Sequence, residues 1–534
     1  MPKSLYLINP RPSHPSYFGA EVFEQTGYAR AQAIADLATV TVAALAPADW
    51  EVRVCEEGVE TIDFDSDADY VGLTGKVIQG QRMVEVADAF RARGKTVLIG
   101  GPHASLSPGA VRDHCDVLLI GELEAIADEL FADLERSCWK PEYVGDKPSL
   151  ETSPLPRFEL YPNDRALSGC VQTSRGCPFE CEFCDVIQYL GRNQRHKTVE
   201  QIIAELDALY ALGFRAIFLA DDNFTVYRKR AKNLLAGLRD WNQSRPDGPV
   251  AFHTQVSIDA ARDLEIMRLC GEAGLTRVFI GIETPNVESL KETGKRQNVG
   301  IDLVEQIEVF LAHGISVTGG MIVGFDHDGP DIFQRQLEFA MATPIPIFTL
   351  GALVAPAATP LFERMKASGR LIETGSETQG VWNTNILPTS MSRGELFAGL
   401  KWLGNNLYSP SNFAQRVVRM IATMGPQLGP FKTGYTPHKA RPVETEAGAV
   451  IRKLFRRGEA ERQMWATISK ALADKPEAGP MVMNSLFSYA QVRCLYETDH
   501  YWEPEMAGAA LAPPPLVAAQ GLATLPRADA KQLL

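Results

Sequence analysis

The sequence predicts an α/β protein with two parallel-sheet units followed by a mainly helical region. Three features predict this fold class. Apolar runs of strand length alternate with helical patterns over residues 1–145, and the same alternation returns over residues 171–355. Beyond about residue 356 only helical periodicity remains. The 534 residues are 45% hydrophobic and 22% charged, which is enough apolar content for several cores.

The first block, residues 1–145, has the pattern of a doubly wound, Rossmann-like sheet. Helical patterns at Ala29–Ala44 and Arg82–Arg93 separate its strands. Ligands of open α/β sheets bind at the carboxyl ends of strands, where this block carries turn residues. The block alone is also compatible with an ordinary flavodoxin-like domain. The predicted strands are Leu5–Ile8, Val52–Cys55, Tyr70–Thr74, Thr96–Ile99 and Val117–Ile120.

The second block, residues 171–355, follows a proline-punctuated linker predicted over residues 146–170. Six β/α units in this length predict a parallel partial barrel of the TIM type, with its chemistry at the carboxyl ends of the strands. The predicted strands are Val171–Ser174, Ala216–Ala220, Val250–Val256, Arg277–Ile282, Ser316–Val323 and Ile345–Leu350. The predicted helices are Val199–Leu212, Arg228–Asn242, Ala260–Ala273, Val304–Ala312 and Asp331–Met341.

The third region, residues 356–503, is predicted to be helical, and the Ala/Pro-rich residues 504–534 are predicted to form a disordered tail. The predicted helices are Leu396–Leu407, Phe413–Met424, Ala447–Arg457 and Ala460–Ala473.

Composition excludes several classes of protein. Lys and Arg number 53 against 66 Asp and Glu, a formal charge of −13, which argues against nucleic-acid binding through a general basic surface. The sequence contains no run of about 20 apolar residues, so no membrane-spanning helix is predicted. The N-terminus lacks the apolar region of a signal peptide, so a cytoplasmic protein is expected. Nine cysteines, an odd number in a long chain, do not fit a secreted disulfide framework.

Three of the nine cysteines form one motif, Cys177-x3-Cys181-x2-Cys184, directly after the first predicted barrel strand. Thiolates are soft ligands for iron–sulfur clusters or zinc. Structural zinc takes four ligands, whereas this loop supplies three. Cys170 precedes the predicted strand Val171–Ser174, so it should lie at the opposite end of that strand from the three cysteines. The sequence therefore favours a [4Fe–4S] cluster with one open iron, and structural zinc is the alternative.

The motif Cys177-x3-Cys181-x-Phe183-Cys184 resembles the signature of the radical S-adenosylmethionine (radical SAM) enzymes. The N-terminal α/β block resembles the cobalamin-binding domain of their B12-dependent branch. Over about residues 5–400 the chain is similar to the subgroup containing hopanoid C-2 methylases and bacteriochlorophyll side-chain methylases. The strings that carry this similarity are Ser174-Arg-Gly-Cys-Pro178, Asp221-Asp222-Asn223-Phe224, Gly281-Ile282-Glu283-Thr284 and Gly320-Met-Ile-Val-Gly-Phe-Asp326.

The resemblance implies roles for residues at the strand ends. Cys177, Cys181 and Cys184 would bind three irons, and S-adenosylmethionine would chelate the fourth. Phe183 would lie beside the adenine. The candidates for hydrogen bonds to S-adenosylmethionine are Asp222, Asn223, Gln255 and Glu283. Glu283 is also suited to an ion pair. For Arg175 a simple salt bridge is favoured.

The resemblance also implies a cobalamin site at the strand ends of the first block. The candidate residues are Thr74, Gly75, Gly100, Gly101, Gly121 and Glu122. His103 is a further candidate, although a solvated loop side chain is the favoured reading. The motif Asp-x-His-x-x-Gly, which supplies a lower axial ligand in many cobalamin domains, is absent. The lower face of the corrin is therefore undetermined by the sequence.

Together these features predict a cobalamin-dependent radical SAM methyltransferase acting on an unactivated carbon of a bulky lipid or tetrapyrrole. The family implies a low-potential electron donor of the flavodoxin or ferredoxin type. One alternative is a cyclase or rearrangement enzyme that uses the same cofactors without methyl transfer. A second alternative is a non-catalytic cobalamin or metal sensor.

The helical region is predicted to cap the barrel and shape the substrate pocket. Trp382, Trp402, Tyr408 and Phe413 are candidates for its lining, with core packing as the favoured role. The basic stretches Arg416–Arg419 and Arg452–Arg457 suggest peripheral contact with an anionic membrane, with a solvated helix face as the favoured reading.

Overall fold

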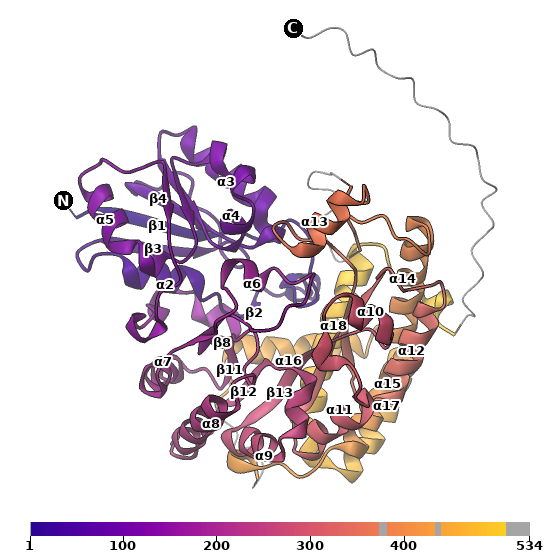
Figure 1. Ribbon diagram of the computed structural model, residues 1–534. Helices are drawn as coiled ribbons and strands as arrows, with labels where there is room; N and C mark the ends of the chain where they lie inside the picture. Colours follow the sequence, from indigo (N-terminus) through magenta and orange to yellow (C-terminus); the bar gives the residue numbers. More distant parts are fainter. Residues whose placement is uncertain (1, 373–381, 433–438, 509–534) are drawn as a thin grey trace, which may run out of the picture.

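The computed structural model describes residues 2–372, 382–432 and 439–508, and Figure 1 shows two α/β units joined to a helical region. The strands are β1 Ser4–Asn9, β2 Gln32–Ile34, β3 Glu51–Glu56, β4 Tyr70–Thr74, β5 Thr96–Gly100, β6 Val117–Ile120, β7 Glu142–Val144, β8 Ala166–Val171, β9 Ser174–Arg175, β10 Arg195–His196, β11 Ala216–Leu219, β12 Ala251–Gln255, β13 Leu275–Glu283, β14 Ser316–Val323 and β15 Ile347–Ala352. The helices are α1 Glu21–Gln25, α2 Ala38–Leu45, α3 Gly80–Arg91, α4 Pro102–Leu106, α5 Ala127–Glu135, α6 Val186–Tyr189, α7 Val199–Ala211, α8 Arg228–Gln243, α9 Leu264–Ala273, α10 Val287–Glu292, α11 Leu303–Ala312, α12 Ile332–Ala342, α13 Pro360–Ala367, α14 Arg393–Leu407, α15 Pro410–Thr423, α16 Pro442–Leu454, α17 Glu459–Asp474 and α18 Gly479–Thr498.

The first sheet is parallel and has the strand order β3-β1-β4-β5-β6-β7. Apolar side chains of α3 and α4 cover one face, and those of α2 and α5 cover the other. The order reverses between β1 and β4, which is the position where doubly wound sheets bind ligands at their carboxyl edge. The predicted fold class of this block is confirmed, and β7 adds a strand that the sequence did not indicate.

The second sheet is the predicted parallel partial barrel, with the order β15-β14-β13-β12-β11-β8-β2. Its first central strand is Ala166–Val171, so it begins inside the predicted linker and not at Val171. The prediction of one helix over Ala29–Ala44 is wrong. Gln32–Ile34 instead forms β2, which pairs in parallel with β8 at the edge of the barrel. This pairing joins segments more than 130 residues apart, and local periodicity does not report such contacts.

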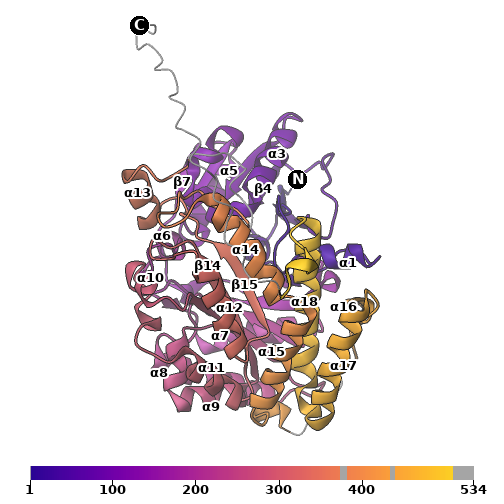
Figure 2. The same cartoon turned by 90° about the vertical axis from the view of Figure 1, so that its right-hand side faces the viewer.

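The helical region packs against the barrel and the N-terminal segment. Helix α18 is buried along most of its length, and Figure 2 shows it between α15 and the pair α16 and α17. The residues predicted to favour core packing are confirmed in that role, since all four are buried: Trp382, Trp402, Tyr408 and Phe413. The prediction of a disordered tail is wrong for residues 504–508, where Pro504–Met506 forms a 3-10 helix and Asn406 exchanges hydrogen bonds with Met506 and Gly508. The rest of the predicted tail, residues 509–534, lies outside the described residues.

Both predicted readings of Arg416 are wrong. This guanidinium is fully buried and donates hydrogen bonds to the carbonyl oxygens of Ile345, Pro346 and Leu407, so it faces neither lipid nor water. The second basic stretch, 452–457, does carry exposed side chains. Among the helices in the described residues, none has the length and apolar character needed to cross a membrane.

The joint between the two α/β units contains a buried carboxyl group, Glu56 at the end of β3. It accepts hydrogen bonds from Asn9 and from Gln32 of β2, and it lies 3.5 Å from the Tyr161 hydroxyl. Burial, with a further contribution from Asp36, raises the pKa of Glu56 to about 8 from a usual value of 4.5.

A raised pKa makes the stability of this joint depend on pH. Below pH 4.5 the carboxyl is protonated in both the folded and the unfolded chain. Between that pH and about 8 only the folded chain retains the proton, so the free energy of unfolding falls as pH rises. We expect Glu56→Gln to flatten the pH profile and to stabilise the protein at pH 8, by at most about 5 kcal/mol. Urea unfolding at pH 5 to 8 measures this, with the exposed Glu51→Gln as control. Parallel profiles for wild type and Glu56→Gln would contradict the assignment.

Candidate functional site

The three motif cysteines lie on the loop that follows β8 and β9, at the carboxyl edge of the barrel. Gly176, immediately before Cys177, has φ +97°, and a Cβ there would lie 2.8 Å from the Asn193 carbonyl oxygen. Only glycine fits this combination of left-handed backbone and close approach. The loop is further fixed by hydrogen bonds from the Cys177 amide to Gly191 and from the Cys184 amide to the Cys181 carbonyl.

The three thiols are withdrawn from water and have backbone N–H groups beside them. Cys181 is buried, Cys177 and Cys184 are half-buried, and none is in a disulfide. Burial raises the pKa of both half-buried thiols, to about 12 for Cys184, so the sulfurs stay protonated unless a positive group offsets the charge. Backbone N–H groups of Phe179 and Val186 reach Cys177 and Cys184 respectively. Such donors stabilise metal-bound thiolates.

No group of three or more His, Cys, Asp or Glu side chains in the described residues converges as ligands of one metal ion would. A cubane cluster requires a different arrangement, because each thiolate binds a separate iron and the sulfurs stay apart. The three thiols of one loop fit that requirement by their chemistry and by the N–H groups around them.

The acidic string after β11 has mainly a structural role at two of its three positions. Asp221 is buried and accepts hydrogen bonds from the Thr173 and Ser174 amides and from the Thr173 hydroxyl, which fixes the end of β8. Asn223 exchanges hydrogen bonds with Ser257 beyond β12, and its contact with cofactor remains a prediction.

Asp222 stays near the cysteine loop and accepts a 3.0 Å hydrogen bond from the Gly176 amide. Burial raises the pKa of its carboxyl to about 6. Of the three residues in the string, Asp222 is the one whose placement leaves it suited to a ligand group.

Glu283 is the most strained candidate. It ends β13 at a bulge and has φ +64°, a value that side chains other than glycine rarely adopt. Its carboxylate lies 2.7 Å from Lys295 Nζ and folds over Gly281, where a Cβ would come within 2.3 Å of Glu283 Oε1. The predicted ion pair is present, with lysine as the partner.

Lys295 connects this carboxylate to the cysteine loop. Burial would lower the pKa of its ammonium group, but the charge of Glu283 and the nearby Cys181 raise it above its usual value. Gln297 Nε2 also donates to Cys181 Sγ at 3.7 Å. A cation and an amide therefore face the thiols from the loop after α10.

The two remaining barrel candidates lie at the same edge. Phe183 is half-buried, with its ring centroid 6.3 Å from that of Phe325 in the loop after β14. Gln255, at the end of β12, has an exposed side chain. Both remain predictions as cofactor contacts.

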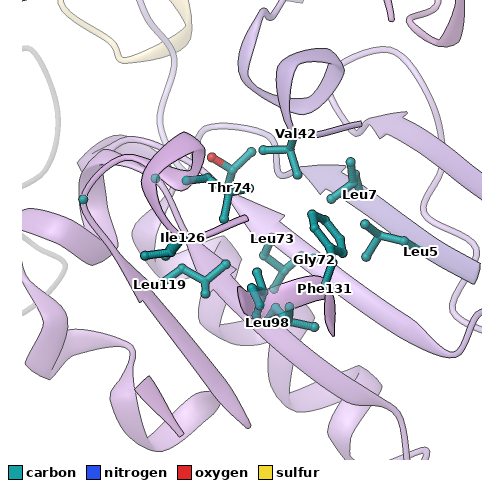
Figure 3. Close-up of a pocket in the computed structure, with 15 residues that line it drawn as sticks. Leu5, Leu7, Val42, Gly72, Leu73, Thr74, Leu98, Leu119, Ile126 and Phe131 are labelled. Atoms are coloured by element: carbon teal, nitrogen blue, oxygen red, sulfur yellow. The ribbon is translucent and has the colours of Figure 1, made fainter. Parts of the chain in front are cut away.

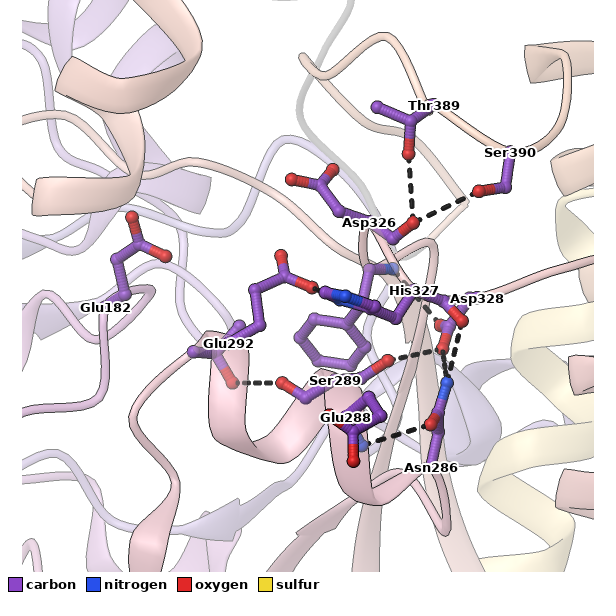
Figure 4. A network of polar contacts seen from close by, with 12 residues as sticks. Glu182, Asn286, Glu288, Ser289, Glu292, Asp326, His327, Asp328, Thr389 and Ser390 are labelled. Atoms are coloured by element: carbon purple, nitrogen blue, oxygen red, sulfur yellow. Dashed lines mark hydrogen bonds and ion pairs between the residues drawn. The ribbon is translucent and has the colours of Figure 1, made fainter.

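Helix α13 anchors the cysteine loop to the helical region. Arg364 donates two hydrogen bonds to Glu182, which lies between Cys181 and Cys184, and it also pairs with Asp326 and Glu292. Figure 4 shows these carboxylates among further polar contacts, including the Thr389 and Ser390 hydroxyls that donate to the Asp326 carbonyl oxygen. Arg364 thus fixes the cysteine loop to α13, and two further carboxylates fix Arg364.

The first sheet carries an apolar cavity of about 70 Å³ at its carboxyl half, on the face covered by α2 and α5. Figure 3 shows leucine side chains and Phe131 around it. Four of the predicted cobalamin residues line it: Thr74, Gly100, Gly101 and Gly121. Gly101 has φ +88°, and a Cβ there would lie 2.5 Å from Thr74 Oγ1. An apolar cavity beside glycine backbone fits a flat, uncharged ligand group.

Three other predicted cobalamin residues do not line this cavity. Gly75 is buried, and its carbonyl accepts a hydrogen bond from the His103 amide. The expectation of a solvated His103 is wrong, because its ring is buried against Gly80 and its Nδ1 has no partner. Burial lowers the pKa of this imidazole.

Glu122 takes part in an ion-pair network between the two units. Arg175 Nη1 and Arg195 Nη1 lie 2.7 and 2.8 Å from Glu122 Oε2, and Arg195 Nη2 contacts Oε1. Arg175 also pairs with Glu124 at 2.7 Å. The favoured reading of Arg175 as a salt-bridge residue is confirmed.

The same network brings the carboxyl edges of the two sheets together. Helix α4, after β5, contacts α6, which directly follows the cysteine loop. The charge of Lys76, after β4, acts on Asp185 beside Cys184. The cysteine loop therefore faces the strand ends of the first sheet.

Sequence reasoning missed Lys295, Gln297 and Arg364. Each acts through a tertiary contact with the cysteine loop and stands in no recognisable spacing. Lys295 and Gln297 lie in the segment after α10 and Arg364 lies in α13, so all three are more than 100 residues from the cysteine loop in sequence.

The Radical SAM superfamily description matches residues 171–340, and a Domain of unknown function (DUF4070) matches residues 359–496. An uncharacterized methyltransferase of Synechocystis sp., sll1242, is 35% identical over 405 residues, which covers 73% of each chain. The hopanoid C-2 methylase of Rhodopseudomonas palustris is 34% identical over 64% of this chain and 66% of that protein. The bacteriochlorophyllide d C-12(1)-methyltransferase of Chlorobaculum tepidum is 28% identical over 61% of this chain and 73% of that protein.

Two solved structures share the fold. The cobalamin-dependent S-adenosylmethionine radical enzyme OxsB, solved with aqua-cobalamin, aligns with a TM-score of 0.59 at 16% identity, over 94% of this chain and 85% of that chain. The radical S-adenosylmethionine methyltransferase TsrM of Kitasatospora setae, solved with cobalamin and a [4Fe–4S] cluster, aligns with a TM-score of 0.55 at 15% identity, over 89% of this chain and 100% of that chain.

Proposed function

This chain belongs to the radical SAM methyltransferase family. We propose that it is a cobalamin-dependent member, and that it transfers a methyl group to an unactivated carbon of a bulky lipid or tetrapyrrole. The observation that carries the proposal is the loop of three thiols at the carboxyl edge of the barrel, turned toward the strand ends of the first sheet. Relatives that act on a hopanoid and on bacteriochlorophyllide support the substrate class.

The residues present fit the three cofactors. Cys177, Cys181 and Cys184 would hold the cluster, and Asp222 and Phe183 would contact S-adenosylmethionine. The cavity beneath Gly101 and Gly121 would take the flat base of the cobalamin tail. When bound, the cluster with S-adenosylmethionine supplies the one-electron chemistry that removes hydrogen from carbon, and cobalamin supplies the methyl group.

The chain's own residues position these groups and offset their charge. Arg364 fixes the backbone between two of the thiols through Glu182, so the loop keeps one shape. Lys295 and Gln297 place a positive charge and an N–H donor beside Cys181, which offsets the charge of bound thiolates. Arg175 and Arg195 hold the first unit over the loop through Glu122.

The experiment is an anaerobic assay of the full chain, reconstituted with iron, sulfide and hydroxocobalamin, with a flavodoxin system as the low-potential electron donor. S-adenosylmethionine carrying a deuterated methyl group is supplied with pigment or lipid extract of a deletion strain. We expect deuterated product, with 5′-deoxyadenosine and S-adenosylhomocysteine formed in equal amounts. Deoxyadenosine without S-adenosylhomocysteine would instead support the cyclase or rearrangement alternative. No deoxyadenosine under any reductant would contradict both.

A further inference from the structure

A second group of polar residues lies on the inner face of the barrel, away from the cysteine loop. On β13, Val278, Ile280 and Ile282 are buried in the core beneath the helices. The alternate residues, Arg277 and Phe279, therefore share the inner face with Gly281 and Glu283. Glu283 follows Arg277 by six positions, so the two residues lie about 20 Å apart along the strand.

Arg277 has no partner for its charge. Its half-buried side chain makes no ion pair or hydrogen bond with any described residue, and partial burial alone lowers the pKa of its guanidinium. The contrast is Arg416, which is buried more deeply but donates to three carbonyl oxygens. The Arg277 guanidinium is only partly withdrawn from water, so it is accessible to the anionic group of a ligand, with which an arginine forms charge-assisted hydrogen bonds.

His253 adds a second unsatisfied group beside Arg277. The two residues are paired in register on the adjacent strands β12 and β13. His253 is 8% exposed, its Nε2 has no hydrogen-bond partner, and its ring stacks on Phe218 with centroids 5.1 Å apart. Burial keeps this imidazole neutral, so Nε2 is able to donate or accept one hydrogen bond.

The surrounding face is aromatic and incompletely covered. Phe218 and Phe279 are half-exposed on the same face as Arg277. Gly320 on β14 lies against the Phe279 ring, where a Cβ would come within 2.9 Å of Cζ. Flat rings beside a glycine strand suit a planar molecule with one anionic end.

We propose that Arg277 and His253 bind a carboxylate at one end of the methyl acceptor, and that Phe218 and Phe279 contact its flat ring system. This inference rests on the proposed function and deepens it, because it selects a carboxylate-bearing tetrapyrrole over a neutral hydrocarbon. The spacing along β13 lets the carboxylate bind deep in the barrel while the far end of the molecule reaches the cysteine loop.

The test compares protoporphyrin IX, which has two propionates, with its dimethyl ester. Binding to the reconstituted full chain is measured by porphyrin fluorescence and needs no turnover. We expect the free acid to bind at least about tenfold more tightly than the ester, which is the effect of one charge-assisted hydrogen bond. Equal binding of acid and ester by the wild-type chain, or binding of neither, would overturn the inference without any variant.

Variants assign the effect to the residue. Arg277→Gln should bring the affinity for the acid down to that for the ester, and Arg277→Lys should keep part of the difference. Arg268→Gln, at an exposed position on α9, is the matched control and should retain the full preference. An unchanged preference in a folded Arg277→Gln chain would overturn the inference. Discrimination of acid from ester in a chain that makes no S-adenosylhomocysteine would leave this site standing while the proposed methyl transfer failed.

Discussion

Replacing Cys177, Cys181 or Cys184 by alanine is expected to abolish the iron–sulfur cluster and to lower deoxyadenosine formation at least about a thousandfold. Each thiolate would bind a different iron, so none of the three is able to substitute for another. The measurements are iron and sulfide content of anaerobically reconstituted protein and deoxyadenosine by mass spectrometry. The three variants should fail alike, because a cluster with two protein ligands is not held.

Two other cysteines provide matched controls. Cys138 is exposed in the first unit, and Cys138→Ala should leave iron content unchanged. Cys170 is buried in β8, and the charged groups that act on its thiol do not include the three motif cysteines. Cys170→Ser should therefore also keep the cluster. Loss of iron in Cys170→Ser, in a chain that still folds, would point to a fourth protein ligand and would remove the open iron.

Much of the fold followed from local pattern. The central strands are short apolar runs bounded by turn residues, and they lie where periodicity predicts them, as β4, β6 and β14 illustrate. Helix α18 escaped prediction for a physical reason. It is surrounded by protein on all sides, so Gly479–Thr498 has no apolar stripe at helical spacing that would distinguish it.

Part of the candidate site was also predicted from the sequence, and part is revealed only by tertiary structure. The cysteines were predicted because one loop carries all three, and thiolates that bind one cluster from a single loop must stand at particular spacings. Asn223 shows the opposite case. It stands in a family string, but its amide is used to join two strand ends, and only tertiary structure reveals that. Lys295 and Arg277 were missed because the geometry of β13 and its neighbours, not their sequence, gives them a role.

Glu122 is the residue where sequence and structure differ most, and its replacement is the second large effect that we expect. The sequence placed it at the cobalamin edge, whereas its carboxylate pairs with Arg175 and Arg195 across the two units. All three side chains are at most 15% exposed. Removing one partner of a buried ion pair leaves charge without compensation, so Glu122→Gln should lower the free energy of unfolding by about 3 kcal/mol.

Chemical denaturation and limited proteolysis of the segment between β7 and β8 measure this loss. Glu24→Gln is the control, because Glu24 pairs with Arg30 on the surface and its side chain is 57% exposed. Its effect should stay within about 0.5 kcal/mol. An equal free energy of unfolding for Glu122→Gln and Glu24→Gln would contradict the role of Glu122 in joining the two units. If Glu122→Gln were as stable as Glu24→Gln but no longer bound cobalamin, Glu122 would be assigned to the cobalamin site. Destabilisation by Glu122→Gln that added cobalamin fully reverses would instead mean that the cofactor bridges the two units, since a ligand of the folded state offsets lost contacts by mass action.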